Sequence, residues 1–196
     1  MGKNNQEQTA DTFRLAMRKF AATVSIISTI TESNSRHGMA ATAVTSLSFE
    51  PLSLLIAVNK SASMHEPLGN AQKFCVNVLQ TSQTEQCEVF SNGEKRQQRF
   101  EIGDWREGKA KLPYLFDAQA NIFCSVGQSI DAGSHSAFIG LVEEVRVRNS
   151  VNPLIYLDGS FLKYQNSSIQ LPQKTKSDTQ SSKNGLQTLE GLDWLW

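Results

Sequence analysis

The sequence has no excess of charge of either sign and no long apolar run. It holds 19 basic and 19 acidic side chains among 196 residues, so its formal net charge is zero. A balanced charge lacks the positive footprint of nucleic-acid binding, so no nucleic-acid partner is expected. No run approaches the roughly 18 apolar residues of a membrane helix, and the polar start contains no signal-peptide core. We therefore expect a cytoplasmic protein that does not enter a membrane.

Cysteine is also scarce, and its spacing argues against structural cross-links. The three cysteines are Cys75, Cys87 and Cys124, and no C-x-x-C pair occurs. Two of them lie in apolar runs that are typical of strands. Buried, reduced thiols fit this pattern better than disulfides or a zinc site, and no metal is implied.

The chain length and a change in composition indicate one domain followed by a tail. We expect a flexible N-terminus at 1–8, a folded domain at 9–165 and a polar, disordered tail at 166–196, because the tail offers little apolar surface to offset its conformational entropy. The tail ends in an apolar cluster that includes Trp194, Leu195 and Trp196. That cluster can dock on this chain, on a twin subunit or on a partner, or it can stay loose.

Apolar periodicity predicts an early helix and many short strands. Phe13, Met17 and Phe20 recur at helical spacing, which indicates a helix from Thr9 to about Phe20 with Thr9 and Asp11 as candidate caps. Strands are expected at 23–30, 38–48, 52–58, 74–79, 118–130, 136–148 and 154–157, and short helices at 64–70 and 83–90. Short strands linked by hairpins predict an antiparallel barrel with peripheral helices. The polar segment 91–105 is expected to be a mobile or ligand-facing loop.

The stretch GMAATAVTSLSFEPLSLLIAVNKSAS at 38–63 joins two of these strands through a corner rich in hydroxyl groups. Its donors suit a phosphate group, but an ordinary sheet surface has the same composition, and the residues alone leave both interpretations open. Period-two alternation places Thr42, Ser46 and Ser48 on one face and Thr45 on the other.

Further motifs follow in order: FCVNVL at 74–79, GSH at 133–135, FIG at 138–140 and NPLIYLDGSF at 152–161. Together with the stretch at 38–63, and over about residues 10–165, they resemble the flavin reductase family. These are small NAD(P)H:flavin oxidoreductases that serve two-component monooxygenases. The resemblance implies a mainly β fold, namely a split antiparallel β-barrel of the FMN-binding type with peripheral α-helices. It also implies a homodimer with flavin near the subunit boundary.

The resemblance also implies which residues form the site. It assigns flavin binding to a set of small and polar residues: Thr42, Ala43, Ser46, Leu47, Ser48, Asn59, Lys60, Ser61 and Ser63. Arg99 and Phe100 match an Arg-Phe pair that reaches dinucleotide phosphate and covers the flavin; a surface ion pair and a core phenylalanine are the alternatives. His135 is the candidate catalytic residue, beside the nicotinamide, where it would orient the ring or exchange a proton; a purely structural turn histidine is the other interpretation.

The function implied is reduction of free FMN or FAD by direct hydride transfer from NADH or NADPH. The reduced flavin would then diffuse to a partner monooxygenase. No G-x-G-x-x-G fingerprint is present, so the residues do not choose between nucleotides. Two alternatives stay open: a flavin-binding electron-transfer module without NAD(P)H turnover, and a structural barrel that acts through its Trp-rich terminus.

Overall fold

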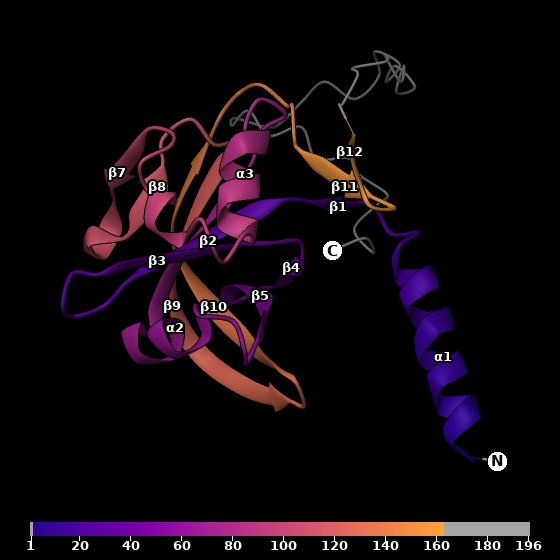
Figure 1. Ribbon diagram of the computed structural model, residues 1–196. Helices are drawn as coiled ribbons and strands as arrows, with labels where there is room; N and C mark the ends of the chain where they lie inside the picture. Colours follow the sequence, from indigo (N-terminus) through magenta and orange to yellow (C-terminus); the bar gives the residue numbers. More distant parts are fainter. Residues whose placement is uncertain (1, 163–196) are drawn as a thin grey trace, which may run out of the picture. The chain divides into compact units, whose positions relative to one another are not determined.

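Antiparallel strands are the main secondary structure of the described chain. The computed structural model describes residues 2–162, and the predicted tail at 166–196 lies outside that range. The main unit is a seven-stranded sheet in which all neighbours are antiparallel (Figure 1). Its strands, in spatial order, are β3 (Arg36–Ala41), β2 (Ser25–Ile30), β6 (Lys73–Val78), β9 (Ala120–Ala132), β10 (His135–Val147), β5 (Leu52–Asn59) and β4 (Val44–Phe49).

The two edges of this sheet are joined to each other. β3 and β4 lie at opposite ends of the strand order, yet only Thr42 and Ala43 separate them in sequence. The sheet must therefore curl until its edges meet at this corner, where the amide of Ala57 donates to the carbonyl of Ala43 at 3.1 Å. Curling without full edge pairing makes a split antiparallel barrel, as the resemblance implies.

Smaller elements surround the barrel. The helices are α1 (Gly2–Met17), α2 (His65–Ala71), α3 (Thr84–Ser91), η1 (Arg96–Gln98) and η2 (Lys109–Lys111). The remaining strands are β1 (Ala22–Thr23), β7 (Trp105–Glu107), β8 (Pro113–Leu115), β11 (Ile155–Leu157) and β12 (Ser160–Leu162). β7 and β8 form a ribbon, and β1, β11 and β12 form a small sheet. Among residues 2–162, no helix has the length and apolarity needed to cross a bilayer.

The two short helices and most of the predicted strands are confirmed to within a few residues. The single strand expected at 38–48 is wrong, because Thr42 and Ala43 divide it into β3 and β4, and the strand expected at 23–30 is divided into β1 and β2. α1 also differs. It begins at Gly2 and ends at Met17, so part of the segment expected to be flexible is helical. The predicted cap Thr9 lies inside the helix, where its hydroxyl donates to the carbonyl of Asn5 at 2.7 Å. A hydroxyl that bonds back to the preceding turn does not terminate a helix, so the composition misplaced the start.

The core has apolar clusters on both faces of β2. Ile27 packs inside the barrel with Ile56 and Phe74, and Ile26 packs on the other face with Phe90 of α3. Figure 1 shows α3 lying across β2 and β3 on this second face. Because both faces are covered, all six residues of β2 are buried, including the hydroxyl residues Ser25, Ser28 and Thr29.

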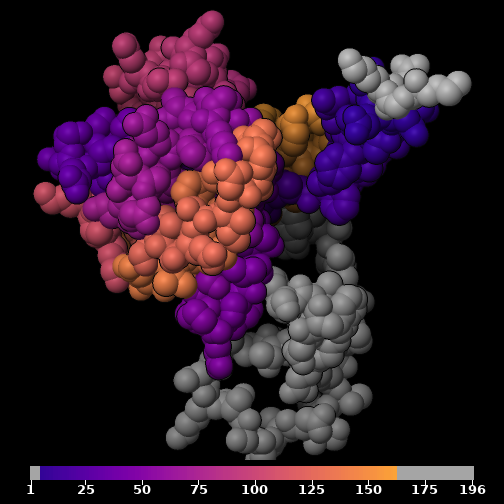
Figure 2. Space-filling view, turned by 90° about the horizontal axis from the view of Figure 1, so that it is seen from below, coloured from indigo at the N-terminus to yellow at the C-terminus, as the bar shows by residue number. Residues whose placement is uncertain are grey.

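The β9–β10 hairpin pairs with β5 and brings the predicted motifs together. In Figure 2 this hairpin, drawn in salmon to orange, lies beside the purple segment that includes β5. A two-residue turn, Gly133–Ser134, connects the two long strands, and Gly133 has a φ of 67°, which glycine adopts without strain. The turn was expected at this place, and it brings His135 opposite Asn59 of β5.

The alternation expected along 42–48 is wrong in one respect. Ser46 lies opposite Leu54, and Ser48 lies opposite Ser53, because a bulge interrupts the register between them. Cross-strand partners share a face, and neighbouring residues of β5 face opposite sides. Ser46 and Ser48 therefore face opposite sides of the sheet, and the intervening Leu47 is half exposed.

Candidate functional site

A cavity of about 350 Å³ opens at the corner where the barrel closes. Four residues predicted for the site line it, and they come from different parts of the sequence: Thr42, Ala43, Asn59 and His135. The barrel edge, β5 and the start of β10 supply them. Closure of the sheet thus gathers residues that are up to 93 positions apart in the chain.

The β9–β10 turn fixes the position of His135. The carbonyl of Ser134 accepts a hydrogen bond from the amide of Lys60 at 2.9 Å, which ties the turn to the end of β5. The Ser134 hydroxyl lies 2.9 Å from Nδ1 of His135. The imidazole is half-buried and lines the cavity, so Nε2 is the ring nitrogen left to meet a ligand.

The Thr42–Ala43 corner offers small groups and backbone to a ligand. Both residues are exposed, and the Thr42 hydroxyl makes no hydrogen bond within the described part of the chain. The neighbouring wall consists of Met39, Ala40 and Ala41 of β3. Small side chains allow a planar ring to approach the backbone closely, and the free hydroxyl supplies a directed donor and acceptor.

The opposite wall comes from residues that the sequence did not indicate. Cys87 and Ser91 of α3 line the cavity, as do Tyr156 of β11 and Phe161 of β12. The two aromatic rings form an edge-to-face pair with centroids 5.7 Å apart. Both belong to the motif NPLIYLDGSF. That motif contributed to the family resemblance, but none of its residues was assigned to the site. Its two aromatic residues were the only feature of the sequence that could have indicated this wall.

Cys87 is a neutral lining group. Burial raises the pKa of its thiol, although the Ser91 hydroxyl, 3.8 Å from Sγ, opposes the shift. Ser91 in turn donates to the carbonyl of Cys87 at 2.8 Å. A protonated thiol is a poor nucleophile, so Cys87 shapes the cavity without covalent chemistry.

Lys60, Ser61 and Ser63 lie beside the cavity in the loop after β5, but they do not line it. Asn59 Oδ1 accepts from the amide of Ser61 at 2.9 Å and from its hydroxyl at 2.8 Å. Lys60 forms an exposed ion pair with Asp131, 2.6 Å long, which lowers the pKa of that carboxyl. A phosphate would therefore compete with Asp131 for the Lys60 ammonium, and the role of this loop in binding stays a prediction.

Ser46, Leu47 and Ser48 run along β4 away from the cavity lining. The Ser48 hydroxyl accepts from the amide of Glu50 at 3.0 Å and so takes part in the turn before β5. Leu47 sits in the bulge. The structure does not bring these three residues together with His135, and their flavin contacts also stay predictions.

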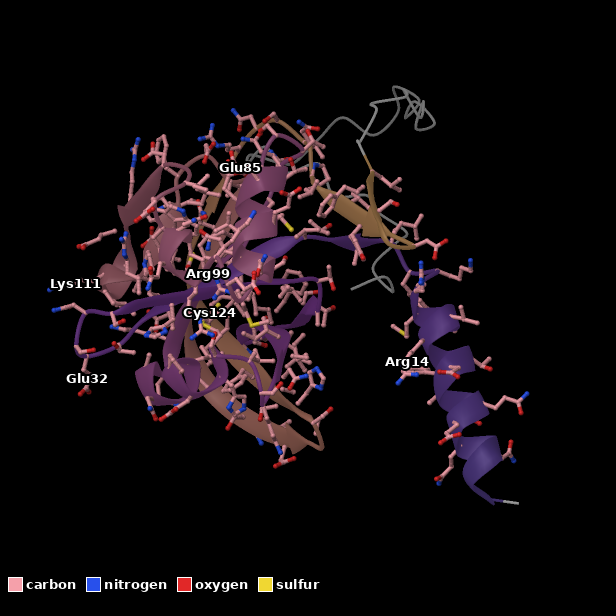
Figure 3. All side chains as sticks on the ribbon, in the orientation of Figure 1. Arg14, Glu32, Glu85, Arg99, Lys111 and Cys124 are labelled. Carbon is pink, nitrogen blue, oxygen red and sulfur yellow. The ribbon has the colours of Figure 1, made fainter. Side chains whose placement is uncertain are left out.

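Arg99 and Phe100 make contacts within the protein. Arg99 is only 6% exposed, and its guanidinium donates to the carbonyls of Gly38 at 2.6 Å, Val89 and Asn92 (Figure 3). These bonds hold the segment after α3 against β3. Phe100 packs edge-to-face against Phe90, with centroids 5.2 Å apart. The packing of Phe100 matches the core phenylalanine given as its alternative, whereas Arg99 is buried against backbone carbonyls and does not form the surface ion pair given as its alternative. Neither residue lines the cavity.

The arrangement suits a planar organic ligand. The cavity lies near the lower end of the roughly 300–1,000 Å³ typical of small-molecule sites, and its walls are mostly apolar with a few polar groups among them. The fold and the cavity together define a split-barrel protein with a small-molecule site at its closing corner.

Comparison with known proteins identifies the family. The model of the family described as "Flavin reductase like domain" matches residues 17–165, and the chain belongs to that family. It is 37% identical over 163 residues to the reductase component of the FADH(2)-dependent resorcinol hydroxylase from Rhizobium sp., covering 82% of this chain and 91% of that protein. It is 33% identical over 144 residues to an FMN reductase (NADH), RutF, from Pseudomonas syringae pv. syringae, covering 74% and 80%.

A solved structure has the same fold. The structure of the NADH:FAD oxidoreductase SgcE6 of Streptomyces globisporus, in complex with NAD and FAD fragments, superposes with a TM-score of 0.75 at 25% identity. The match covers 82% of this chain and 96% of that one. The fold and the family expected from the motifs are both confirmed.

Proposed function

We propose that this flavin reductase transfers a hydride from a reduced nicotinamide to FMN or FAD in the cavity at the Thr42–Ala43 corner. One observation carries the proposal. Thr42, Ala43, Asn59 and His135, chosen from motifs far apart in the sequence, line a single cavity of a size that suits a planar ring. The names of the relatives, an FMN reductase (NADH) and a reductase component of an FADH(2)-dependent hydroxylase, support this assignment.

Flavin, when bound, supplies the redox chemistry by accepting a hydride at its ring. The chain contributes position: orientation of two reactants alone can lower a barrier by several kcal/mol, about 7–11 at most. Tyr156 and Phe161 form one wall, and the corner residues form the other. The aromatic wall excludes water from the reacting faces, and the Thr42 hydroxyl and Asn59 orient the polar edge of the ring.

His135 is the one titratable side chain in this cavity besides Cys87 and Tyr156. Its Nδ1 is held by Ser134, so its Nε2 can orient the carboxamide of nicotinamide or hold a proton near the flavin edge. Cys87 stays protonated because burial raises the pKa of its thiol, and it does not compete as a nucleophile.

A steady-state assay tests the function directly. Purified protein should oxidise NADH or NADPH faster when free FMN or FAD is added. Comparing the four combinations of nucleotide and flavin identifies which nucleotide and which flavin the enzyme uses. Failure of all four pairings would refute the proposal. The alternative electron-transfer module would bind flavin and stay yellow, and anaerobic NADH or NADPH would not bleach it.

The reduced flavin should serve a monooxygenase component, as in the two-component systems named among the relatives. Transfer through diffusing flavin requires no stable complex. In a coupled assay under low oxygen, an oxygenase separated from this protein by a dialysis membrane would still receive reduced flavin. The free, buried cysteines agree with a reducing, cytoplasmic location.

We further propose a homodimer that covers α1. Phe13 and Phe20 are 64% and 66% exposed, and with Met17 they face a groove of about 1060 Å³ that also touches the Thr42–Ala43 corner. Exposed apolar surfaces of this kind mark interaction sites. A second copy of the chain seated there would lie against the flavin cavity, since Thr42 and Ala43 line both spaces.

A further inference from the structure

The hairpin of β11 and β12 supplies the aromatic wall of the cavity at the barrel corner. Tyr156 lies opposite Phe161 in this hairpin, and both residues line the cavity. Asp158 and Gly159 connect the two strands, and their φ angles are 49° and 87°. An Asp-Gly pair with two positive φ angles is typical of the type I′ turn, whose twist matches that of the flanking strands. The position of the aromatic wall therefore depends on what holds this hairpin.

The base of the hairpin is fixed to the barrel, but its tip is not packed in the core. The amide of Leu154 donates to the carbonyl of Leu79 at 2.9 Å, and the carbonyl of Leu154 accepts from the amide of Val24 at 2.9 Å. The Leu154 side chain is buried with Val24 and Ile26. At the other end, residues 158–160 are exposed. Contacts other than core packing must hold the tip.

Arg18, directly after α1, supplies these contacts. Its Nε donates to Oδ1 of Asp158 at 2.8 Å, and its Nη2 donates to the carbonyl oxygen of the same residue at 3.3 Å. The amide of Asp158 donates in return to the carbonyl of Arg18 at 3.2 Å. Among the side chains that the structure describes, Arg18 is the only one that hydrogen-bonds to residues 155–162 from outside the hairpin. Figure 1 shows the end of α1 beside β11 and β12.

The contact depends on the shape of the guanidinium as well as on its charge. Two nitrogens of Arg18 reach two oxygens of one residue, which the compact ammonium of a lysine does not do in the same geometry. The hydrogen bond from Arg18 lowers the pKa of the Asp158 carboxyl, and the positive charge of Lys19 adds to this effect. Both side chains of the pair are more than half exposed, so the pair contributes little to global stability. Its effect is confined to the hairpin tip.

We propose that Arg18 is a positioning residue for the flavin site: by holding the β11–β12 turn, it keeps Tyr156 and Phe161 in place against the ring of the bound flavin. The inference rests on the proposed function, because it requires flavin in the corner cavity. Arg18 does not line that cavity, so its effect passes through the hairpin. A wall that is held in place before binding avoids the entropy cost of ordering it when the ligand binds. Arg18 therefore increases flavin affinity without touching flavin.

Flavin titration of Arg18→Gln tests this role. The dissociation constant of FMN or FAD should rise about fivefold, near the upper end of what an exposed ion pair contributes, while the midpoint of thermal unfolding stays within about 2 °C of the wild type. The fluorescence lifetime of the bound flavin, which a neighbouring tyrosine shortens, should become longer as Tyr156 moves away. Lys19→Gln removes the adjacent positive charge, but Lys19 makes no hydrogen bond to Asp158, so this control should match the wild type in all three measurements.

A second background shows whether Arg18 acts through the aromatic wall. When Tyr156 and Phe161 are both replaced by leucine, adding Arg18→Gln should change the dissociation constant of flavin by less than about twofold, because coupled residues are not additive. A fivefold effect that persists in this background would overturn the proposal, as would equal flavin affinity and lifetime in the wild type and Arg18→Gln. A wild type that binds no flavin and is inactive with every nucleotide and flavin pairing would instead refute the proposed function.

Discussion

His135 is fixed by its immediate neighbours, and this makes its contribution separable from flavin binding. Ser134 holds Nδ1, and the amide of Lys60 holds the turn. We expect His135→Ala to slow NADH-dependent reduction about tenfold, or about 1.4 kcal/mol in the barrier, because it removes an orienting group. The dissociation constant of flavin should change by less than about threefold. Anaerobic stopped-flow and fluorescence titration measure the two quantities.

Ser134→Ala is the matched control for this prediction. It removes the hydrogen bond to Nδ1 and leaves the imidazole in place, so a smaller loss of rate is expected. An unchanged rate in His135→Ala would remove His135 from the site and favour the structural interpretation of this turn histidine.

Asn77 shows how a single residue holds the core together. It is fully buried, and its Nδ2 donates to the carbonyl of Ile26 at 2.9 Å. Its Oδ1 accepts from the amide of Leu115 at 2.8 Å and from Asn121 at 2.9 Å. Asn77→Ala would leave the buried amide of Leu115 without this acceptor and would remove one of the two bonds of Asn121, and we expect a loss of about 2–4 kcal/mol in the free energy of unfolding. Urea denaturation measures it.

Asn121→Ala serves as the comparison for Asn77→Ala. It leaves the bonds of Asn77 to Ile26 and Leu115 intact, so the free energy of unfolding should fall by less than in Asn77→Ala. Equal losses in the two variants would show that the polar network does not act through Asn77.

The three thiols should differ in reactivity because they differ in position. Burial raises the pKa of Cys75 and raises that of Cys124 to about 12. A raised pKa keeps a thiol protonated, so at pH 8 both should resist alkylation in the native protein and react fully in urea. Cys87 lines the cavity and should react first, and more slowly when flavin is bound. Mass spectrometry of alkylated peptides follows each site; rapid labelling of native Cys124 would contradict this order.

At the scale of elements, the packing of α3 on β3 determines one wall of the site. A Cβ on Gly38 would lie 2.6 Å from Cε1 of Phe90, so α3 can approach this closely only over a glycine. Gly38→Ala should cost about 1–3 kcal/mol by overpacking and should move α3, which carries Cys87 and Ser91. We therefore expect weaker flavin binding together with a lower midpoint of thermal unfolding.

Gly93→Ala is the control for the effect of Gly38. No atom lies within 4 Å of a Cβ built at Gly93, which follows the same helix. This variant should keep both the stability and the flavin affinity of the wild type. Normal flavin binding in a destabilised Gly38→Ala would show that α3 does not shape the site.

At the scale of the whole molecule, the proposed homodimer makes a prediction about the exposed apolar residues of α1. Phe13→Glu combined with Met17→Glu places two charges in the groove and should weaken self-association at least about tenfold, because burying an unpaired charge is costly. Light scattering after size-exclusion chromatography, over a range of concentrations, measures it. Leu15→Glu changes an equally exposed residue outside the groove and should leave the dimer intact. A monomeric wild type would refute the dimer.

Local periodicity was enough to predict α2, α3 and the β9–β10 hairpin, because each depends on residues close together in sequence. The motifs were enough to predict the family and four cavity residues. The bulge that separates Ser46 from Ser48, the burial of Arg99 and the presence of Cys87 and Tyr156 in the cavity could not be predicted. Each depends on pairing or packing between segments far apart in the chain.

The corner at Thr42 and Ala43 illustrates the difference between what the local sequence determines and what the tertiary structure determines. Its composition, two small residues followed by a strand rich in hydroxyl groups, is local, and by itself it left a binding surface and an ordinary sheet surface both open. The corner lines a cavity because the seven-stranded sheet curls. This curling places His135, Tyr156 and Phe161 next to Thr42 and Ala43. Composition sets which contacts a residue can make, but the long-range pairing of strands decides which residues are near enough to make them.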